Sequence, residues 1–266
     1  MKLDYIYHSG FAIEADGVTV IIDYYKDTSE EAPNRGIVHD CLLKKPGMLY
    51  VLSSHFHPDH FNREVLSWKE ERPDIRYIFS KDILKHRRAA AEDATYINKG
   101  DVYEDGHIRI EAFGSTDVGI SFLIDLQGIR LFHAGDLNNW HWSEESTPQE
   151  IRKAEGDFLA EIKTLQQKAP LVDVAMFPVD SRIGKDYMRG AEQFVERAAC
   201  ASGELACAMA IVSSSVRVRL SSEAACKGTT AQTSHNTNWV MYLIMSGFYT
   251  VLHKSLSKKH ATLTRD

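Results

Sequence analysis

The sequence lacks the features that mark several large protein classes. Its four cysteines have no CxxC spacing, which argues against a thiolate zinc site and against a disulfide framework. The formal net charge of -6 offers no basic surface and weighs against a nucleic-acid partner. The N-terminal residues show no charged-then-apolar signal pattern, so we expect a cytoplasmic protein. The most apolar run, Trp239–Leu252, is shorter than the ~20 residues that cross a bilayer, and no membrane partner is expected.

What is present fits one large globular domain. The chain has 266 residues, of which 44% are hydrophobic, enough for a sizeable core. Alternating apolar residues predict strands, and apolar residues at helical spacing predict helices. The expected strands cover residues 3–8, 11–14, 18–22 (closed by Asp23), 48–52, 75–79, 172–180 and several runs over 94–132, the last group forming a second sheet. The expected helices cover residues 63–71, 82–92, 148–167 and 190–200, and residues 26–46 should be a surface loop with at most one short helix.

Three histidines and one aspartate fall within six residues, directly after the apolar run 48–52. They are His55, His57, Asp59 and His60. Imidazole and carboxylate are ligands that borderline divalent metals such as zinc prefer. A strand that ends in a tight loop can direct all four side chains into one cleft, and Pro58 stiffens this loop by fixing its own φ. We interpret the stretch as a metal site.

The arrangement His-x-His-x-Asp-His resembles the signature of the metallo-β-lactamase superfamily. This resemblance implies an α/β (α+β) fold, the four-layer αββα sandwich, and a metal-dependent hydrolase with two divalent metal ions. Zinc is the expected metal, with Mn²⁺ or Fe²⁺ as alternatives. It also implies that His55 and His57 hold the first metal, and Asp59 and His60 the second. Di-iron oxidoreductases of the superfamily carry Glu where this chain has His57, which favours the hydrolytic branch.

A second motif follows about 75 residues later. The run 131–136 ends in Gly135-Asp136 and looks like the superfamily's motif whose aspartate bridges the two metals. A bridging carboxylate places negative charge between two cations and holds them close enough to share a hydroxide. Gly135 lets the backbone approach the metals without a Cβ in the way. The alternative for Asp136 is a simple cap at the end of a strand.

Candidate substrate contacts rest on resemblance to one branch of the superfamily. The stretch from Tyr7 to Phe11 looks like the "GHSSF" segment of the ascorbate-phosphate-lactonase-like branch, so His8 is expected near the metals, in contact with substrate or in a structural role. In that branch the loop after residues 176–180 covers the cleft, which makes Asp180 and Arg182 candidate contacts. The planar guanidinium of Arg182 suits a carboxylate or phosphate. His141 belongs either to a substrate wall or to a packed loop.

These resemblances imply a small anionic ester or lactone as substrate. Phosphodiester cleavage is the alternative. Asp59 is also a candidate to pass a proton to the leaving group. The sequence leaves open whether the chain forms a homo-oligomer.

The chain departs from the family pattern at two places. The Gly-His-Thr turn that brings a third histidine to the first metal has no histidine here, at residues 114–117. Asp117 is then either an oxygen ligand, which makes a harder site suited to Mn²⁺ or Fe²⁺, or a turn residue. The second departure begins near residue 198, so the predicted domain covers residues 1–197 and 198–266 form an atypical segment without the expected last histidine. One hypothesis is a shifted reading frame, and a second is a member that binds metal without turnover.

Overall fold

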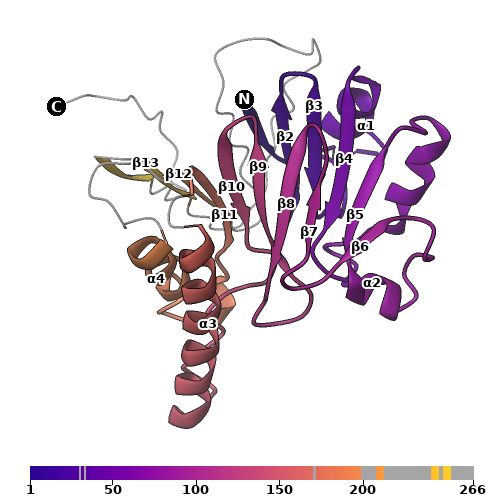
Figure 1. Cartoon of the computed structure of the whole chain (residues 1–266). Coiled ribbons are helices and arrows are strands. Elements are labelled where there is room, and N and C mark those ends of the chain that lie inside the picture. The colour runs from indigo at the N-terminus through magenta and orange to yellow at the C-terminus, as the bar shows by residue number, and fades with distance from the viewer. Residues whose placement is uncertain are drawn as a thin grey trace.

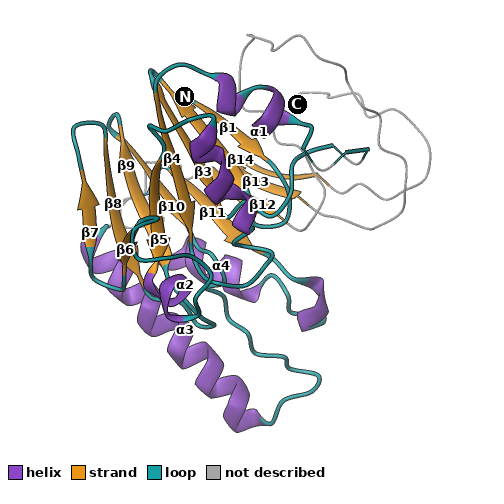
Figure 2. Ribbon diagram, turned by 90° about the vertical axis from the view of Figure 1, so that its right-hand side faces the viewer, coloured by secondary structure: helices purple, strands orange, loops and turns teal. Residues whose placement is uncertain are grey.

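The structure is a computed structural model, shown in Figure 1. It describes residues 1–29, 31–32, 34–169, 172–198, 208–212, 241–245 and 248–252. The described strands form two sheets, and helices lie on the outer faces of both (Figures 1 and 2). The predicted αββα sandwich is therefore confirmed. Among the described residues, no helix combines the length and the apolar character needed to cross a membrane.

The first sheet has the strand order β1-β2-β3-β4-β5-β6. The strands β1, β2 and β3 are antiparallel neighbours, whereas β3, β4, β5 and β6 run parallel. Their bounds are β1 Lys2–Tyr5, β2 Phe11–Ala15, β3 Val18–Ile22, β4 Met48–Ser53, β5 Arg76–Ser80 and β6 Thr95–Ile97. The prediction was wrong for β6, which joins the first sheet by pairing Ile78 with Thr95 instead of starting the second.

The second sheet has the order β14-β13-β12-β11-β10-β9-β8-β7. An antiparallel meander from β7 to β10 continues through parallel β11 and β12 into antiparallel β13 and β14. The bounds are β7 Val102–Glu104, β8 Ile108–Phe113, β9 Ser121–Leu126, β10 Ile129–His133, β11 Val174–Pro178, β12 Ala208–Val212, β13 Met241–Met245 and β14 Phe248–Leu252. Three strands thus come from residues 198–266. Most of that segment lies outside the described residues, so its divergence and the reading-frame hypothesis stay predictions.

Short helices cover the outer face of the first sheet. They are α1 Ile37–Asp40, the 3₁₀ helices η1 Leu42–Lys44 and η2 Arg63–Glu70, and α2 Lys81–Lys85. Residues 26–46 therefore hold two short helices rather than at most one, because Val38, Leu42 and Leu43 are buried against the sheet. The predicted helix 82–92 ends early. Arg87 has a φ of 56°, in the left-handed region that an α-helix cannot continue through.

The helices α3 Pro148–Lys168 and α4 Arg189–Ala198 cover the outer face of the second sheet, and both figures show them side by side. The short 3₁₀ helix η3, Ser181–Ile183, precedes α4. A capping box defines the start of α3, because Thr147 accepts a hydrogen bond from the backbone N–H of Glu150 and the Glu150 side chain accepts one from Thr147. The predicted helix 148–167 is confirmed to within one residue, and its buried face carries Phe158, Ile162 and Leu165.

The main core lies between the sheets. Apolar side chains from both inner faces meet there, including Val20 and Leu52 from the first sheet and Ile110, Phe122 and Leu131 from the second. Fully burying a side chain of this size stabilises the fold by roughly 1.5–3 kcal/mol. This packing fixes the sheets against each other, and it brings the ends of β3, β4 and β10 to one rim of the sandwich.

Candidate metal centre

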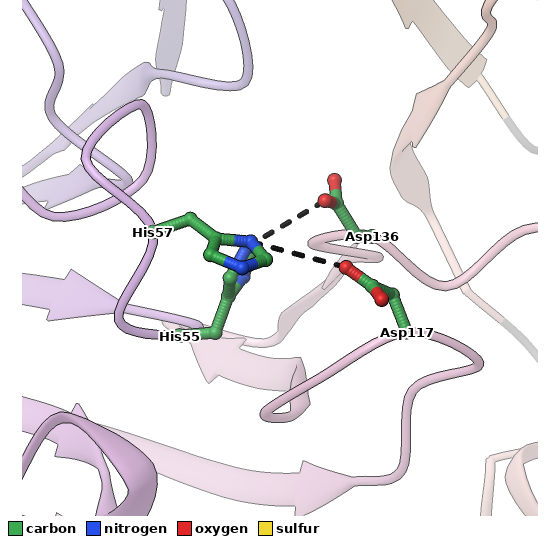
Figure 3. Close-up of side chains that lie close together, drawn as sticks. All are labelled: His55, His57, Asp117 and Asp136. Atoms are coloured by element: carbon green, nitrogen blue, oxygen red, sulfur yellow. Dashed lines mark ion pairs between the residues drawn. The ribbon is translucent and has the colours of Figure 1, made fainter. Parts of the chain in front are cut away.

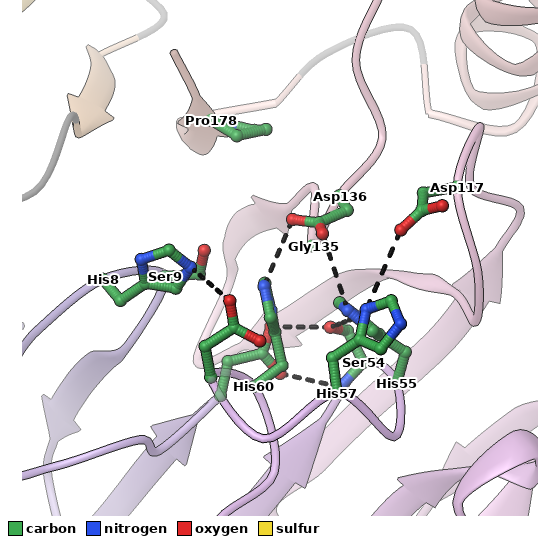
Figure 4. A network of polar contacts seen from close by, with 12 residues as sticks. His8, Ser9, Ser54, His55, His57, His60, Asp117, Gly135, Asp136 and Pro178 are labelled. Atoms are coloured by element: carbon green, nitrogen blue, oxygen red, sulfur yellow. Dashed lines mark hydrogen bonds and ion pairs between the residues drawn. The ribbon is translucent and has the colours of Figure 1, made fainter. Parts of the chain in front are cut away.

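The candidate site lies where three strands end. Strands β3 and β4 are parallel, with Ile22 opposite Leu52, so the residues that follow them leave the same edge of the sheet. Strand β10 of the second sheet ends nearby, and the loop after it carries Asp136. The carboxyl ends of parallel strands are a common place for ligand sites in α/β folds. Here they bring together side chains that are far apart in the sequence (Figure 4).

One group of ligand-type side chains contains His55, His57, Asp117 and Asp136. One nitrogen or oxygen atom from each lies within 4.8 Å of the corresponding atoms of the others. Nε2 of His55 is 3.5 Å from Oδ2 of Asp136, and Nδ1 of His57 is 3.9 Å from Oδ2 of Asp117. Figure 3 shows the two histidines facing the two carboxylates. The set matches the ligands expected for a first metal.

A second group contains His8, Asp59 and His60, whose ligand atoms also lie within 4.8 Å of one another. Nε2 of His8 is 3.1 Å from Oδ2 of Asp59. Nε2 of His60 is 3.2 Å from Oδ1 of Asp136, so Asp136 directs one oxygen toward His55 and the other toward His60. This is the placement that a bridging carboxylate requires.

Asp23 orients the His60 ring. Its carboxylate accepts hydrogen bonds from the backbone N–H of Ser54 at 2.7 Å and from the Ser54 hydroxyl at 2.6 Å, and it lies 2.8 Å from Nδ1 of His60. Burial alone raises the pKa of Asp23, but the electrostatic influence of His133 and the hydrogen bond and charge of His60 outweigh it and lower the pKa to about 2. An ionised Asp23 holds the Nδ1 proton of His60 and presents Nε2 to Asp136, as carboxylates do behind metal-bound histidines.

Sequence reasoning missed this role of Asp23. The residue follows a strand in which every side chain is buried, and it is itself fully buried. An acidic residue directly after such a strand, at the same sheet edge as the His-rich loop, is the signal that would have found it. Buried carboxylates are rarely left without a charged partner.

Among the described residues, two buried nitrogen atoms at the centre have no partner with good hydrogen-bond geometry. They are Nε2 of His55 and Nε2 of His60, and both point toward Asp136. Leaving a buried polar atom unpaired costs roughly 1–3 kcal/mol. Burial, together with the charge of His60, lowers the pKa of His55 to about 4, which keeps this imidazole neutral and able to bind a cation. The residues present therefore fit divalent metal ions.

The turn between β8 and β9 brings Asp117 to the histidines. Gly119 in this turn has a φ of 75°, and a Cβ there would overlap the Ser54 carbonyl oxygen and the Cβ of His55. The backbone N–H of Ile120 donates to the same carbonyl at 3.0 Å. The turn is thus fixed against the His-rich loop. This placement favours the ligand alternative for Asp117 over the turn-residue alternative.

The backbone around Asp136 is held tightly. Gly135 has a φ of 55°, and a Cβ there would lie only 3.0 Å from the Ile120 carbonyl oxygen and from the Ser54 side chain. The close approach seen at this glycine is to these protein atoms, and the expected approach of its backbone to the metals stays a prediction. The indole N–H of Trp140 donates to the Asp136 carbonyl at 2.8 Å. These contacts fix the direction of the Asp136 side chain.

The remaining predicted substrate contacts have other partners in the structure. His141 is buried, with Nε2 3.2 Å from the Asp186 carbonyl and Nδ1 accepting the Ser143 N–H at 3.2 Å, which favours the packed-loop alternative. Nε of Arg182 donates to both carboxylate oxygens of Asp180, at 2.9 and 2.8 Å. The Arg182 side chain is nevertheless 78% exposed. Asp180 raises the pKa of Arg182, and Asp136 and Asp59 contribute to the same shift, so the guanidinium lies within electrostatic range of the centre.

Comparison with known proteins places this geometry in a family. Residues 2–151 match the family model of the β-lactamase superfamily domain. No curated protein matches the chain. Solved structures with a similar fold include CmlA, a diiron β-hydroxylase from Streptomyces venezuelae, at 16% identity, 74% coverage of this chain, 42% coverage of that chain and a TM-score of 0.48. The present chain thus spans less than half the length of that enzyme.

Two further similar structures are of more comparable length. A protein from Parabacteroides distasonis, provisionally assigned as a metal-dependent hydrolase, is 18% identical, with 73% of this chain and 76% of that chain covered and a TM-score of 0.47. The metallo-β-lactamase fold protein YhfI from Bacillus subtilis is 9% identical, with 68% and 72% covered and a TM-score of 0.44. The family match spans more than half of the chain and includes every residue of both ligand groups. The protein therefore belongs to the β-lactamase superfamily and has the metallo-β-lactamase sandwich fold.

Proposed function

We propose that this protein is a metal-dependent hydrolase that uses two divalent cations to cleave a small anionic ester or lactone. The position of Asp136 carries the proposal. One carboxylate oxygen lies 3.5 Å from Nε2 of His55 and the other 3.2 Å from Nε2 of His60, and in the described part of the chain both buried nitrogen atoms lack a partner with good hydrogen-bond geometry. One carboxylate between two such imidazoles suits a pair of cations better than it suits an ion pair with either histidine alone.

The ligand sets follow from the two groups of side chains. The first cation would be held by His55, His57, Asp117 and Asp136, and the second by Asp59, His60 and Asp136. When bound, two cations supply a hydroxide at neutral pH and polarise the substrate carbonyl. The ligands are imidazoles and carboxylates without thiolate, a set that suits Zn²⁺ and also admits Mn²⁺ or Fe²⁺.

Asp59 acts in this proposal mainly as a ligand. Its hydrogen bond with His8 holds the pKa of Asp59 well below the usual range of a carboxyl, despite the opposing effect of burial. Efficient proton transfer at neutral pH requires a group whose pKa lies near the operating pH. Asp59 is therefore better suited to holding a cation than to carrying the proton to the leaving group.

The preference for an anionic substrate rests on Arg182. Its guanidinium is mostly exposed, lies within electrostatic range of Asp136 and Asp59, and pairs only with Asp180 among the contacts found in the described residues. A carboxylate or phosphate on the substrate can share the guanidinium donors with Asp180, because guanidinium has five N–H groups. The resemblance to the lactonase-like branch supports the ester or lactone class within this group.

The test combines metal analysis with a substrate panel. Protein purified without chelator should contain two divalent cations per chain, measured by mass spectrometry of the metals, and should hydrolyse a lactone or phenyl ester that carries a negative charge. Asp157→Ala, on the exposed face of α3, is the matched control for Asp136→Ala. Two bound cations without turnover of any ester, lactone or phosphodiester would instead support the member that binds metal without catalysis. Turnover of a phosphodiester alone would favour that reaction class.

A further inference from the structure

We propose that His8 is a ligand of the second cation, joining Asp59, His60 and Asp136. This inference rests on the proposed two-metal centre and completes it. The family resemblance leads one to expect a last histidine after the strand that follows α4, and most residues after β12 lie outside the described part of the chain. His8 reaches the centre from the opposite end of the sequence, on the turn between β1 and β2.

The position of the His8 ring supports this assignment. Nε2 of His8 lies 3.1 Å from Oδ2 of Asp59, and the ligand atoms of His8, Asp59 and His60 lie within 4.8 Å of one another. The rings of His8 and His60 face each other edge to face, with centroids 5.4 Å apart. Figure 4 shows the His8 ring on the same side of the centre as His60. Donors to one zinc ion lie at about 2.0–2.2 Å from it, so small side-chain rotations bring these atoms to a common cation.

A simple ion pair between His8 and Asp59 does not account for the neighbouring atom. Nε2 of His60 belongs to the same group and is buried, and among the described residues it has no partner with good hydrogen-bond geometry, although Oδ1 of Asp136 lies 3.2 Å away. Nδ1 of the same ring lies 2.8 Å from Asp23. The ring therefore cannot rotate to bring Nε2 to a different partner without breaking this contact. A cation held by His8, Asp59 and His60 satisfies the buried nitrogen and the two more exposed side chains together.

The backbone holds His8 in an uncommon conformation. Its φ is 55°, in the left-handed region that residues other than glycine rarely adopt. Hydrogen bonds within the turn fix it, from the Ile6 N–H to the Gly10 carbonyl at 2.9 Å and from the Gly10 N–H to the Tyr7 carbonyl at 2.8 Å. Strained residues of this kind persist where the surroundings over-determine them, most often at functional sites.

The second sheet anchors the same turn. Nε2 of His133, at the end of β10, donates to the Ser9 carbonyl at 2.9 Å, while its Nδ1 accepts the Gly135 N–H at 3.2 Å. A cavity of about 10 Å³, room for one water molecule, separates the turn from Gly135 and the end of β11. The turn that carries His8 and the loop that carries Asp136 are thus joined through one buried histidine. The two cation positions then have equivalent ligand sets, each with two imidazoles and two carboxylates, and share Asp136.

Metal-binding measurements on His8 variants test the inference without reference to activity. Chelator-treated wild-type protein should bind two Zn²⁺ ions in competition with a chromophoric chelator. In His8→Ala the first ion should bind as in the wild type, and the affinity for the second ion should fall at least about tenfold. Removing a residue that only hydrogen-bonds to a metal ligand already lowers metal affinity by about this factor. His107→Ala removes an exposed histidine from the turn between β7 and β8 and should leave both affinities unchanged.

A second variant covers the case in which His8→Ala fails to fold. His8→Cys keeps a ligand at the position, so adding the second equivalent of Co²⁺ should produce a sulfur-to-metal charge-transfer band that the wild type lacks. Two unchanged Zn²⁺ affinities in His8→Ala, or no such band in His8→Cys, would overturn the assignment of His8. A raised KM in His8→Ala with both affinities unchanged would make His8 a substrate contact. Wild-type protein that binds fewer than two ions would instead overturn the two-metal centre itself.

Discussion

Oδ2 of Asp23 lies 2.8 Å from Nδ1 of His60, and this contact determines which nitrogen of the ring faces the centre. Asp23 is buried, and its other contacts hold Ser54, the residue before His55. One carboxylate therefore orients His60 directly and fixes the backbone on which His55 stands. Asp23 therefore positions ligands of both proposed cations without being a ligand itself.

Replacing Asp23 by Asn should weaken metal binding more than it weakens the fold. The amide keeps the shape of the side chain but removes the charge that holds the Nδ1 proton of His60. Loss of such a partner typically lowers metal affinity about 10–100-fold. Competition titrations with Zn²⁺ measure the effect, and Asp157→Asn on the exposed face of α3 is the control. An unchanged affinity for both ions would show that Asp23 serves only the fold.

Removing the carboxylate of Asp136 should abolish activity through loss of metal. In Asp136→Ala the buried Nε2 atoms of His55 and His60 lose a carboxylate that faces both. Metal analysis should then find at most one ion per chain, and hydrolysis should fall to the background rate. The bridging assignment is wrong if the variant keeps two ions and the full rate.

Gly119→Ala should disturb the first cation position. The left-handed φ of 75° disfavours any side chain, and the added Cβ would overlap the Ser54 carbonyl and His55. We expect a loss of about 1–3 kcal/mol in the free energy of unfolding, measured by urea denaturation, together with weaker binding of one ion. Gly106→Ala is the matched control, because a Cβ at Gly106 meets no atom within 4 Å. Equal stability of the two variants would contradict the close packing of this turn.

Arg182→Ala should raise KM for an anionic substrate roughly tenfold, which corresponds to about 1.4 kcal/mol, with little change in kcat. The reason is that the exposed guanidinium is proposed to bind the substrate anion rather than the reacting atoms. Asp180→Asn should lower KM, since it releases the guanidinium from its present partner. Steady-state kinetics with charged and neutral esters distinguish these effects. Equal KM values for wild type and Arg182→Ala on a charged ester would exclude the contact.

A second polar cluster, away from the metal centre, should make stability depend on pH. His39 lies between Asp27, 2.8 Å from Nδ1, and Glu64, 2.6 Å from Nε2, with the rings of Tyr24 and Trp68 against it. The hydrogen bond to Asp27 raises the pKa of His39 above its usual 6.5, although burial opposes the shift. Burial raises the pKa of Asp27, but hydrogen bonds from His39 and from backbone N–H groups outweigh it and lower the pKa below 3.8.

The signs of these two shifts define the pH window. The contribution of His39 is complete below pH 6.5 and is lost as the pH rises through its raised pKa. The contribution of Asp27 is complete above pH 3.8 and is lost as the pH falls through its lowered pKa. The cluster should stabilise the fold most between these values. His39→Gln should lose about 1–3 kcal/mol there and show a smaller decline in stability above pH 6.5 than the wild type, in urea denaturation at several pH values. Parallel pH profiles would contradict this.

The elements that could be predicted from the sequence depend on local signals. The capping box of Thr147 and Glu150 lies within four residues, and α3 was predicted to within one residue. The loop from His55 to His60 and the Gly135-Asp136 pair are short motifs, and the structure brings them together. The superfamily and its sandwich fold were therefore predictable from two short stretches of chain.

The elements that could not be predicted depend on contacts between distant residues. Asp23 and Ser54 meet only because β3 and β4 pair in parallel, and no local pattern specifies that pairing. The sequence of the three residues of β6 is compatible with a strand in either sheet. Their pairing with β5 is what places them in the first sheet. Residues 86–92 have helix-forming side chains, yet Arg87 adopts a left-handed conformation and the Arg88 N–H donates back to the Ile83 carbonyl at 2.9 Å, which closes the helix end.

The wide sequence spacing of the ligand groups has a consequence for folding. His8, His60 and Asp136 come from three separate segments, and the last lies in the loop that follows β10 of the other sheet. The unfolded chain offers no assembled site, so cations select the state in which both sheets have already docked. Bound ions would link the two sheets and would slow unfolding. Chelation should then shorten the lifetime of the native protein under protease challenge, even where its secondary structure by circular dichroism is unchanged.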